Sequence, residues 1–155
     1  DQMLINGEID ALMSSAAPKS FIDGNPDIVR LYPNFEDVES AHYRKTGIFP
    51  IMHTIAIKRE ITEQNPWMAK NLFTAFEAAK NRSTARMRDV TISRYPNPWN
   101  FVSAERARAL FGEDIWPYGI EPNRRTLETF LQFCLEQGIA HRPVTVEELF
   151  VPQVQ

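Results

Sequence analysis

Three short stretches in the first part of the chain have the apolar pattern of β-strands. Ile9–Met13 is a short apolar run after Gly7, and Asp27–Pro33 is a second run after the break at Asn25-Pro26. Phe49–Lys58 is the longest of the three. Its alternate positions share one face, and these are Ile51, His53, Ile55 and Ile57. The pattern therefore predicts three strands, with the polar segment 34–42 between the second and third as an irregular stretch or a short helical turn.

Helical spacing and helix-capping residues dominate the rest of the chain. Asn65-Pro66 predicts a helix start with asparagine as N-cap, and Ser103 predicts the cap of a short helix that stops at Gly112. Asn123 is expected to cap the most regular amphipathic helix, which ends at Gly138. The apolar stripe of that helix is Leu127, Phe130, Leu131, Cys134 and Leu135. Thr145 with Glu148 predicts a capping box for a last short helix.

The order of these elements, strands first and helices last, predicts an α/β fold. A few short strands would leave sheet edges uncovered, so the sheet is expected to be completed by residues outside this sequence. The opening DQMLINGEID has the pattern of a last helical turn that stops at Asn6-Gly7. We therefore expect the sequence to be the carboxy-terminal half of a longer protein.

Composition and charge narrow the classes of function. The 155 residues are 43% hydrophobic and carry a formal net charge of -3 without a run of Lys or Arg, which argues against nucleic-acid binding. No apolar run is long enough to span a bilayer, so membrane insertion is not expected. The single cysteine, Cys134, excludes an internal disulfide framework and a cysteine-rich zinc site, and its place on an apolar helix stripe indicates a core residue.

His53 is the residue with the clearest potential for chemistry. It lies among isoleucines at the end of the segment TGIFPIMH. This segment directly follows Tyr43, Arg44 and Lys45. Histidine changes charge near neutrality and suits general acid–base catalysis, although a lone histidine on an apolar strand face is ordinarily a core residue. None of the three histidines has a partner at metal-ligand spacing, so no metal site is predicted within the chain itself.

Several segments together resemble one family. They are GEIDAL (with the acid Glu8), RLYPN, YRKTGIFPIMH, NPWMAKNLFTAFEAAK and WPYGIEPNRRTLETFLQFCLEQG. The chain is identified from these segments, over residues 7–150, as similar to the second half of 4,5-dihydroxyphthalate decarboxylases. TGIFPIMH and WPYGIEPNR are the most specific of them.

The resemblance implies a fold similar to type 2 periplasmic binding proteins, with two α/β lobes around a hinged cleft. Residues 1–45 would then be the end of the second lobe and the crossover. Residues 46–155 would return to the first lobe and carry the carboxy-terminal helices. The TGIFPIMH strand would present its start to the cleft.

The resemblance also implies an activity, the loss of one carboxyl group from 4,5-dihydroxyphthalate to give protocatechuate in aromatic catabolism. Arg44 and Arg124 are the candidates that hold the two carboxylates, because the planar guanidinium matches a carboxylate bidentately. Asn123 contributes the helix terminus beside Arg124. His53 is the candidate that protonates the ring carbon, and Tyr118 would hydrogen-bond the catechol oxygens. Ser14, in the loop after GEIDAL, is a further substrate-binding candidate.

Two alternatives remain open at this stage. The scheme needs no cofactor, although a metal bound partly by residues outside the chain would polarise the same oxygens. A solute-binding protein that delivers a small organic anion to a transporter would use the same cleft and arginines. The enzyme would be cytoplasmic and the binding protein periplasmic. The expected partners are a small aromatic or organic anion, the amino-terminal half of the same protein and, through an uncovered sheet edge, a second copy of the chain.

Overall fold

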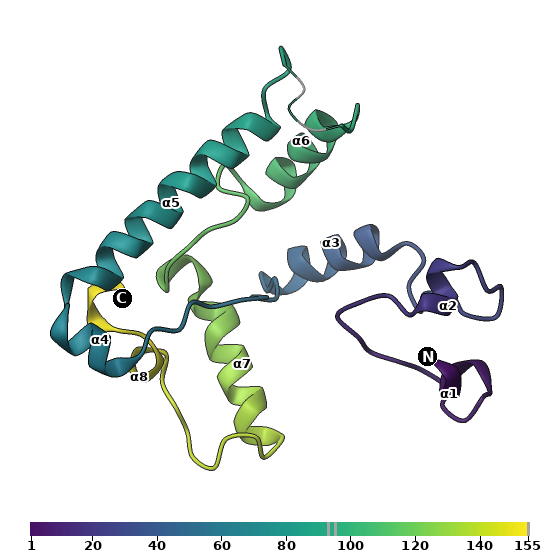
Figure 1. The fold of residues 1–155 in the computed structure, drawn as a ribbon, viewed down its shortest axis with the longest axis horizontal. Helices are drawn as coiled ribbons and strands as arrows, with labels where there is room; N and C mark the ends of the chain where they lie inside the picture. Colours follow the sequence, from purple (N-terminus) through teal and green to yellow (C-terminus); the bar gives the residue numbers. More distant parts are fainter. Residues whose placement is uncertain (93, 95, 155) are drawn as a thin grey trace. The chain divides into compact units, whose positions relative to one another are not determined.

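The computed structural model describes residues 1–92, 94 and 96–154, and the described residues form helices and irregular segments without a β-strand (Figure 1). The predicted α/β fold is therefore wrong, and with it the sheet of a periplasmic-binding-protein-like architecture. Residues 9–13, 27–33 and 49–58 are irregular and join no ladder within the described chain. Alternation of apolar residues shows which side chains share a face, but a strand forms only where a second strand supplies hydrogen-bond partners.

The chain divides into two compact units, residues 1–41 and 42–155. The first contains two single-turn helices, α1 (Gln2–Ile5) and α2 (Lys19–Ile22). The Asp1 carboxylate joins them, because it accepts hydrogen bonds from the backbone N–H and the hydroxyl of the buried Ser20. Arg30 lies over the rings of Phe21 and Phe35, 5.2 and 5.1 Å from the centroids. This unit is thus held mainly by polar and cation–π contacts.

Helix α3 (Phe35–Thr46) occupies the segment for which the sequence predicted an irregular stretch or a single turn. Its first turn carries Glu36 and Asp37, and its last turn carries Arg44 and Lys45. Acidic residues at the N-terminus and basic residues at the C-terminus stabilise a helix through its dipole. The charge distribution was therefore a helix signal, and it outweighed the weak hydrophobic periodicity of this segment.

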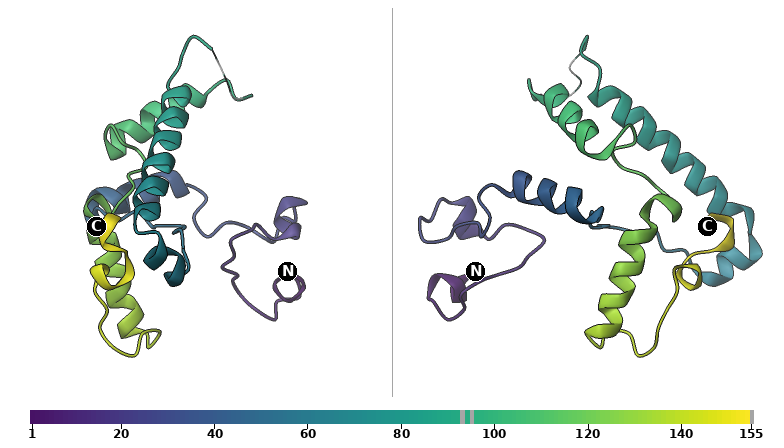
Figure 2. Two further views of the ribbon diagram at one scale, coloured as in Figure 1. Left: turned by 60° about the vertical axis from the view of Figure 1, so that its left-hand side comes forward. Right: turned by 180° about the vertical axis from the view of Figure 1, so that it is seen from behind.

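The remaining helices of the described residues lie in the second unit. They are α4 (Arg59–Gln64), α5 (Trp67–Met87), α6 (Asn100–Phe111), the 3-10 turn η1 (Glu121–Asn123), α7 (Arg124–Glu136), α8 (Val146–Leu149) and the 3-10 turn η2 (Pro152–Val154). Helix α6 lies alongside the C-terminal part of α5, and α8 packs on α7 (Figures 1 and 2). Helices α4 and η2 also pack on α5.

A small core joins α7, α8 and the turn before α7. Ile120, Leu127 and Val146 are buried together, and Leu131 and Phe150 pack against them. The α7 stripe predicted from the sequence is only partly buried, because Phe130 and Leu135 stay exposed while Leu127 and Cys134 are buried as expected. Unit 2 therefore buries few large side chains.

The predicted helix ends are a mixture of correct and wrong assignments. The capping box is confirmed, since the Thr145 hydroxyl accepts from the Glu148 N–H and the Glu148 carboxylate accepts from the Thr145 N–H. The stops at Gly112 and Gly138 are also confirmed. The side-chain caps predicted for Asn65 and Ser103 are wrong. Asn65 ends α4, with its amide donating to the Ile61 carbonyl, and Ser103 lies inside α6.

Candidate functional site

The two segments that carry the most specific part of the family resemblance meet in unit 2. Phe49 of TGIFPIMH lies edge-on to Trp116 of WPYG, with 6.1 Å between ring centroids. Phe111, at the end of α6, contacts both Phe49 and Tyr43, at 5.0 and 4.6 Å. Such edge-to-face pairs stabilise a fixed geometry beyond simple burial. Aromatic packing therefore fixes the turn after α3 beside the turn before α7.

At Gly47, the first turn of α7 also comes close to the start of TGIFPIMH. The φ of +66° at Gly47 is a left-handed conformation that favours glycine, and this residue ends α3, where its N–H donates to the Tyr43 carbonyl. A β-carbon at this position would lie 3.5 Å from Nη1 of Arg125, which is van der Waals distance, so the Arg125 guanidinium lies near the glycine. The first turn of α7 is thus packed on the start of TGIFPIMH.

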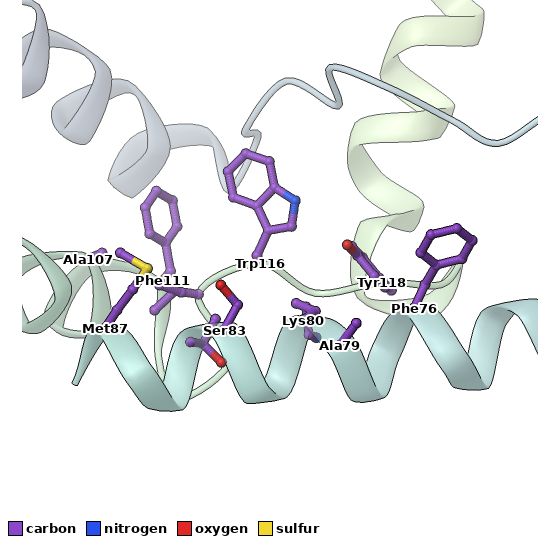
Figure 3. A pocket seen from close by; sticks show the side chains of 11 residues that line it. Phe76, Ala79, Lys80, Ser83, Met87, Ala107, Phe111, Trp116 and Tyr118 are labelled. Atoms are coloured by element: carbon purple, nitrogen blue, oxygen red, sulfur yellow. The ribbon is translucent and has the colours of Figure 1, made fainter. Parts of the chain in front are cut away.

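An open groove of about 530 Å³ runs between α5, α6 and residues 115–118 (Figure 3). Its lining is Phe76, Ala79, Lys80, Ser83, Thr84, Met87, Ala107, Phe111, Ile115, Trp116 and Tyr118. Aromatic rings and small side chains form most of the wall, with hydroxyl groups among them. This combination suits a planar ring that carries hydrogen-bonding substituents.

Lys80 is the charged residue in the groove wall, and only 7% of it is exposed. Its ammonium donates to Glu77 and Asp114, each at 2.7 Å, and lies 4.9 Å from the centroid of the Tyr118 ring. Burial acts to lower the pKa of Lys80, but the hydrogen bonds to Asp114 and Glu77 and their charges outweigh it, so the pKa is raised. One cation faces two carboxylates here, which leaves a local excess of negative charge.

Asn123 belongs to the same turn region as Tyr118, but it does not cap α7 with its side chain. Its amide instead donates to the carbonyls of Pro117 and Gly119, both at 2.9 Å. These bonds hold the turn that presents Tyr118 to the groove. The φ of +91° at Gly119 and the Phe73 ring 3.6 Å from a β-carbon placed there add to the fixed shape of the turn.

Arg124 is engaged in ion pairs within the protein. Its guanidinium contacts Glu121, Glu147 and Glu128, at 2.7, 2.8 and 3.5 Å. The hydrogen bonds to Glu121 and Glu147 raise its pKa far above the ordinary arginine value. Arg124 would have to give up carboxylates of its own chain in order to bind those of a ligand.

The other predicted site residues are not assembled with the groove by any contact among the described residues. His53 is exposed in the irregular segment between α3 and α4, and Arg44 is exposed in the last turn of α3. Ser14 belongs to the first unit, where its hydroxyl accepts from the Ala16 N–H at 3.3 Å. Their assignment to a substrate site stays a prediction.

Two residues of this region were missed by the reasoning from sequence. Lys80 follows Phe73 and Phe76 on one helix face, at positions i+7 and i+4, and this spacing was a usable signal for burial. Arg125 had no such signal. Adjacent arginines in one motif look equivalent until their neighbours in space are known.

The described residues were also searched for metal ligands and for membrane-spanning helices. Residues 1–92, 94 and 96–154 contain no group of three or more His, Cys, Asp or Glu side chains placed to hold a metal ion. Within the same residues, none of the helices combines the length and the apolar character needed to cross a bilayer.

Comparison with known proteins supports the resemblance seen in the motifs. No family model matches the chain. The chain is 31% identical over 150 residues to a 4,5-dihydroxyphthalate decarboxylase of Comamonas testosteroni, and the match covers 97% of the chain and 46% of the relative. The chain thus spans about half the length of this relative, consistent with its carboxy-terminal half. The chain is therefore similar, over nearly all of its own length, to about half of a 4,5-dihydroxyphthalate decarboxylase.

Proposed function

We propose that the protein decarboxylates a dihydroxylated aromatic dicarboxylate of the 4,5-dihydroxyphthalate type, in the cytoplasm and as a step of aromatic catabolism. The observation that carries the proposal is the similarity over 97% of the chain to a 4,5-dihydroxyphthalate decarboxylase. The groove between α5 and α6 supports it, because its aromatic walls and hydroxyl groups suit a hydroxylated ring.

The proposed reaction needs an acid that protonates the ring and a ring substituent that stabilises the intermediate formed by this protonation. The acid protonates the ring carbon that bears the departing carboxylate, and the hydroxyl group para to it stabilises the resulting cationic, dienone-like intermediate. The bond between that carbon and the carboxylate then breaks. Carbon dioxide leaves, its bonding electrons restore the aromatic ring, and the acid recovers its proton from water.

The roles proposed for the side chains follow the family motifs. We assign the acid to His53, whose exposed position leaves it accessible to a ligand. Tyr118, which lines the groove beside Lys80, is assigned to the catechol oxygens. Arg44 is assigned to a carboxylate. Because Lys80 is outnumbered by the carboxylates of Glu77 and Asp114, the groove wall disfavours a ligand carboxylate near it and favours the hydroxylated edge of the ring.

The test uses the complete gene product with 4,5-dihydroxyphthalate, followed by chromatography for protocatechuate. We expect product in proportion to protein, and a fall of at least about a hundredfold in kcat for His53→Gln, the size expected for loss of a general acid. The matched control is His141→Gln, an exposed histidine outside these motifs, which should keep the parent rate. A His53→Gln variant as active as the parent would remove His53 from the mechanism.

A parent protein that forms no product contradicts the decarboxylase proposal. If it nevertheless binds the dianion, as shown by an increase in Tm with ligand concentration, the solute-binding function becomes the better description. If it neither binds nor reacts, both functions are wrong for this substrate.

A further inference from the structure

The turn at Gly47 gathers positive charge that no ion pair within the described residues neutralises. Arg44 and Lys45 precede this glycine in the last turn of α3, and the Arg125 guanidinium lies against it. None of these cations has a carboxylate within ion-pair distance among the described residues. Other arginines of the same unit contrast with them, since carboxylates contact Arg88, Arg108, Arg124 and Arg142.

Arg125 differs most clearly from its neighbour Arg124. Both lie in the first turn of α7, but Arg124 holds three glutamates whereas Arg125 holds none within the described chain. The guanidinium N–H groups of Arg125 likewise donate to no described acceptor. An arginine with a defined position and unused donors is suited to bidentate recognition of a ligand carboxylate.

The position of Arg125 also places it close to the aromatic junction, by which we mean the contacts of Phe49 with Phe111 and Trp116. A β-carbon at residue 47 would lie 3.5 Å from Nη1 of Arg125, and two residues later Phe49 packs on Trp116, which lines the groove. Such a β-carbon would be in van der Waals contact with the guanidinium, so Arg125 lies next to the start of TGIFPIMH. A benzene ring with carboxylates would thus meet a cation at one edge and aromatic side chains beside it.

We infer that Arg125, and not Arg124, binds a carboxylate of the substrate. The inference rests on the proposed function for the class of ligand, an aromatic dicarboxylate. It assigns Arg124 a structural role, that of joining η1, α7 and α8 through its glutamates.

The experiment compares two substitutions of the same type at adjacent positions. Arg125→Gln and Arg124→Gln are made in the complete gene product, and binding of phthalate, which lacks the hydroxyl groups of the proposed substrate, is measured by calorimetry at fixed ionic strength. Arg125→Gln should weaken phthalate binding at least tenfold, as expected for loss of a charge-assisted bond. Arg124→Gln should change the affinity less than threefold and lower Tm instead. Far-UV circular dichroism shows whether each variant is folded.

Each other outcome has a defined meaning. Equal loss of affinity in both variants, unchanged affinity in Arg125→Gln, or no phthalate binding by the parent overturns the inference. If the parent converts 4,5-dihydroxyphthalate and Arg125→Gln leaves the KM unchanged, the role assigned to Arg125 is wrong and the proposed function is unaffected. A parent that binds phthalate through Arg125 but forms no protocatechuate contradicts the proposed function alone.

Discussion

Lys80 shows how a single charged side chain can be accommodated in an apolar groove wall. Removing an ammonium from water is costly unless its charge is compensated, and here Glu77 and Asp114 supply that compensation. Glu77 comes from the preceding turn of α5, whereas Asp114 comes from the segment after α6. Lys80 therefore ties this segment, and the turn with Tyr118 that follows it, to helix α5.

Replacing Lys80 should destabilise the protein by more than an exposed lysine would. Lys80→Met keeps the aliphatic stem but leaves Glu77 and Asp114 without their cation. We expect a loss of about 1–3 kcal/mol in the free energy of unfolding, below the value for fully buried pairs because both carboxylates are partly exposed. Urea unfolding measures this, with Lys70→Met, an exposed lysine of the same helix, as a control that should change by less than about 0.5 kcal/mol. Equal effects in both variants would contradict the importance of the cluster.

The same residue predicts a pH dependence of stability. The pKa of Lys80 in the folded protein is raised above 10.5, so its charged form contributes its full stabilisation below that pH. The contribution is lost as the pH rises through the folded-state pKa. The stability difference between parent and Lys80→Met should thus be constant from neutral pH to about 10 and shrink above 10.5. A difference that stays constant through this alkaline range would show that Lys80 is not the titrating group.

At the scale of elements, the capping box of α8 can be tested directly. α8 is a single turn, so its two reciprocal bonds between Thr145 and Glu148 satisfy a large share of its free N–H groups. Val146 in this turn is 2% exposed and belongs to the core. Loss of the cap therefore disturbs core packing as well as the helix.

Thr145→Ala should lower the free energy of unfolding by about 1 kcal/mol, the usual value for an N-cap. Thermal unfolding measures the change. Thr74→Ala is the matched control, because the Thr74 hydroxyl is exposed within α5 and donates to the Lys70 carbonyl without capping a helix. A Thr145→Ala variant with the parent Tm would show that α8 is held by packing alone.

Which elements could be read from the sequence depended on how local their causes are. Capping boxes and glycine stops are set by neighbours within a few residues, and those at Thr145, Gly112 and Gly138 were predicted correctly. Strands depend on a partner far away in the chain, so the alternation in Phe49–Lys58 gave a wrong prediction. For the site, Tyr118, which was selected from the sequence as a substrate-binding residue, lines the groove, and its contact with a substrate stays a prediction.

The rest of the site could not be predicted because it depends on contacts between distant segments. Arg124 and Arg125 are equivalent in sequence, and only the ion pairs of one and the glycine contact of the other distinguish them. Likewise, no local pattern shows that Phe49 and Trp116 meet. These contacts are properties of the assembled unit.

At the scale of the whole unit 42–155, the aromatic junction connects segments that are far apart in the sequence. Phe49 contacts Phe111 and Trp116, and thereby links the chain after α3 to the end of α6 and to the turn that lines the groove. The unit has few fully buried large side chains, so partly buried rings carry a larger share of its stability. The junction should therefore matter more than the partial exposure of its rings suggests.

Phe49→Ala should remove both edge-to-face contacts and lower the free energy of unfolding by about 1–3 kcal/mol, less than for a fully buried phenylalanine. A double-mutant cycle with Trp116→Leu should give a coupling energy of about 0.5–1.5 kcal/mol, because the rings contact each other. The control is Phe130→Ala, whose ring is 61% exposed on α7 and should cost less than about 1 kcal/mol. A coupling energy near zero, with additive single effects, would mean that the two motif segments are held together by other contacts, and the link between TGIFPIMH and the groove would then have to be sought at Gly47 and Arg125.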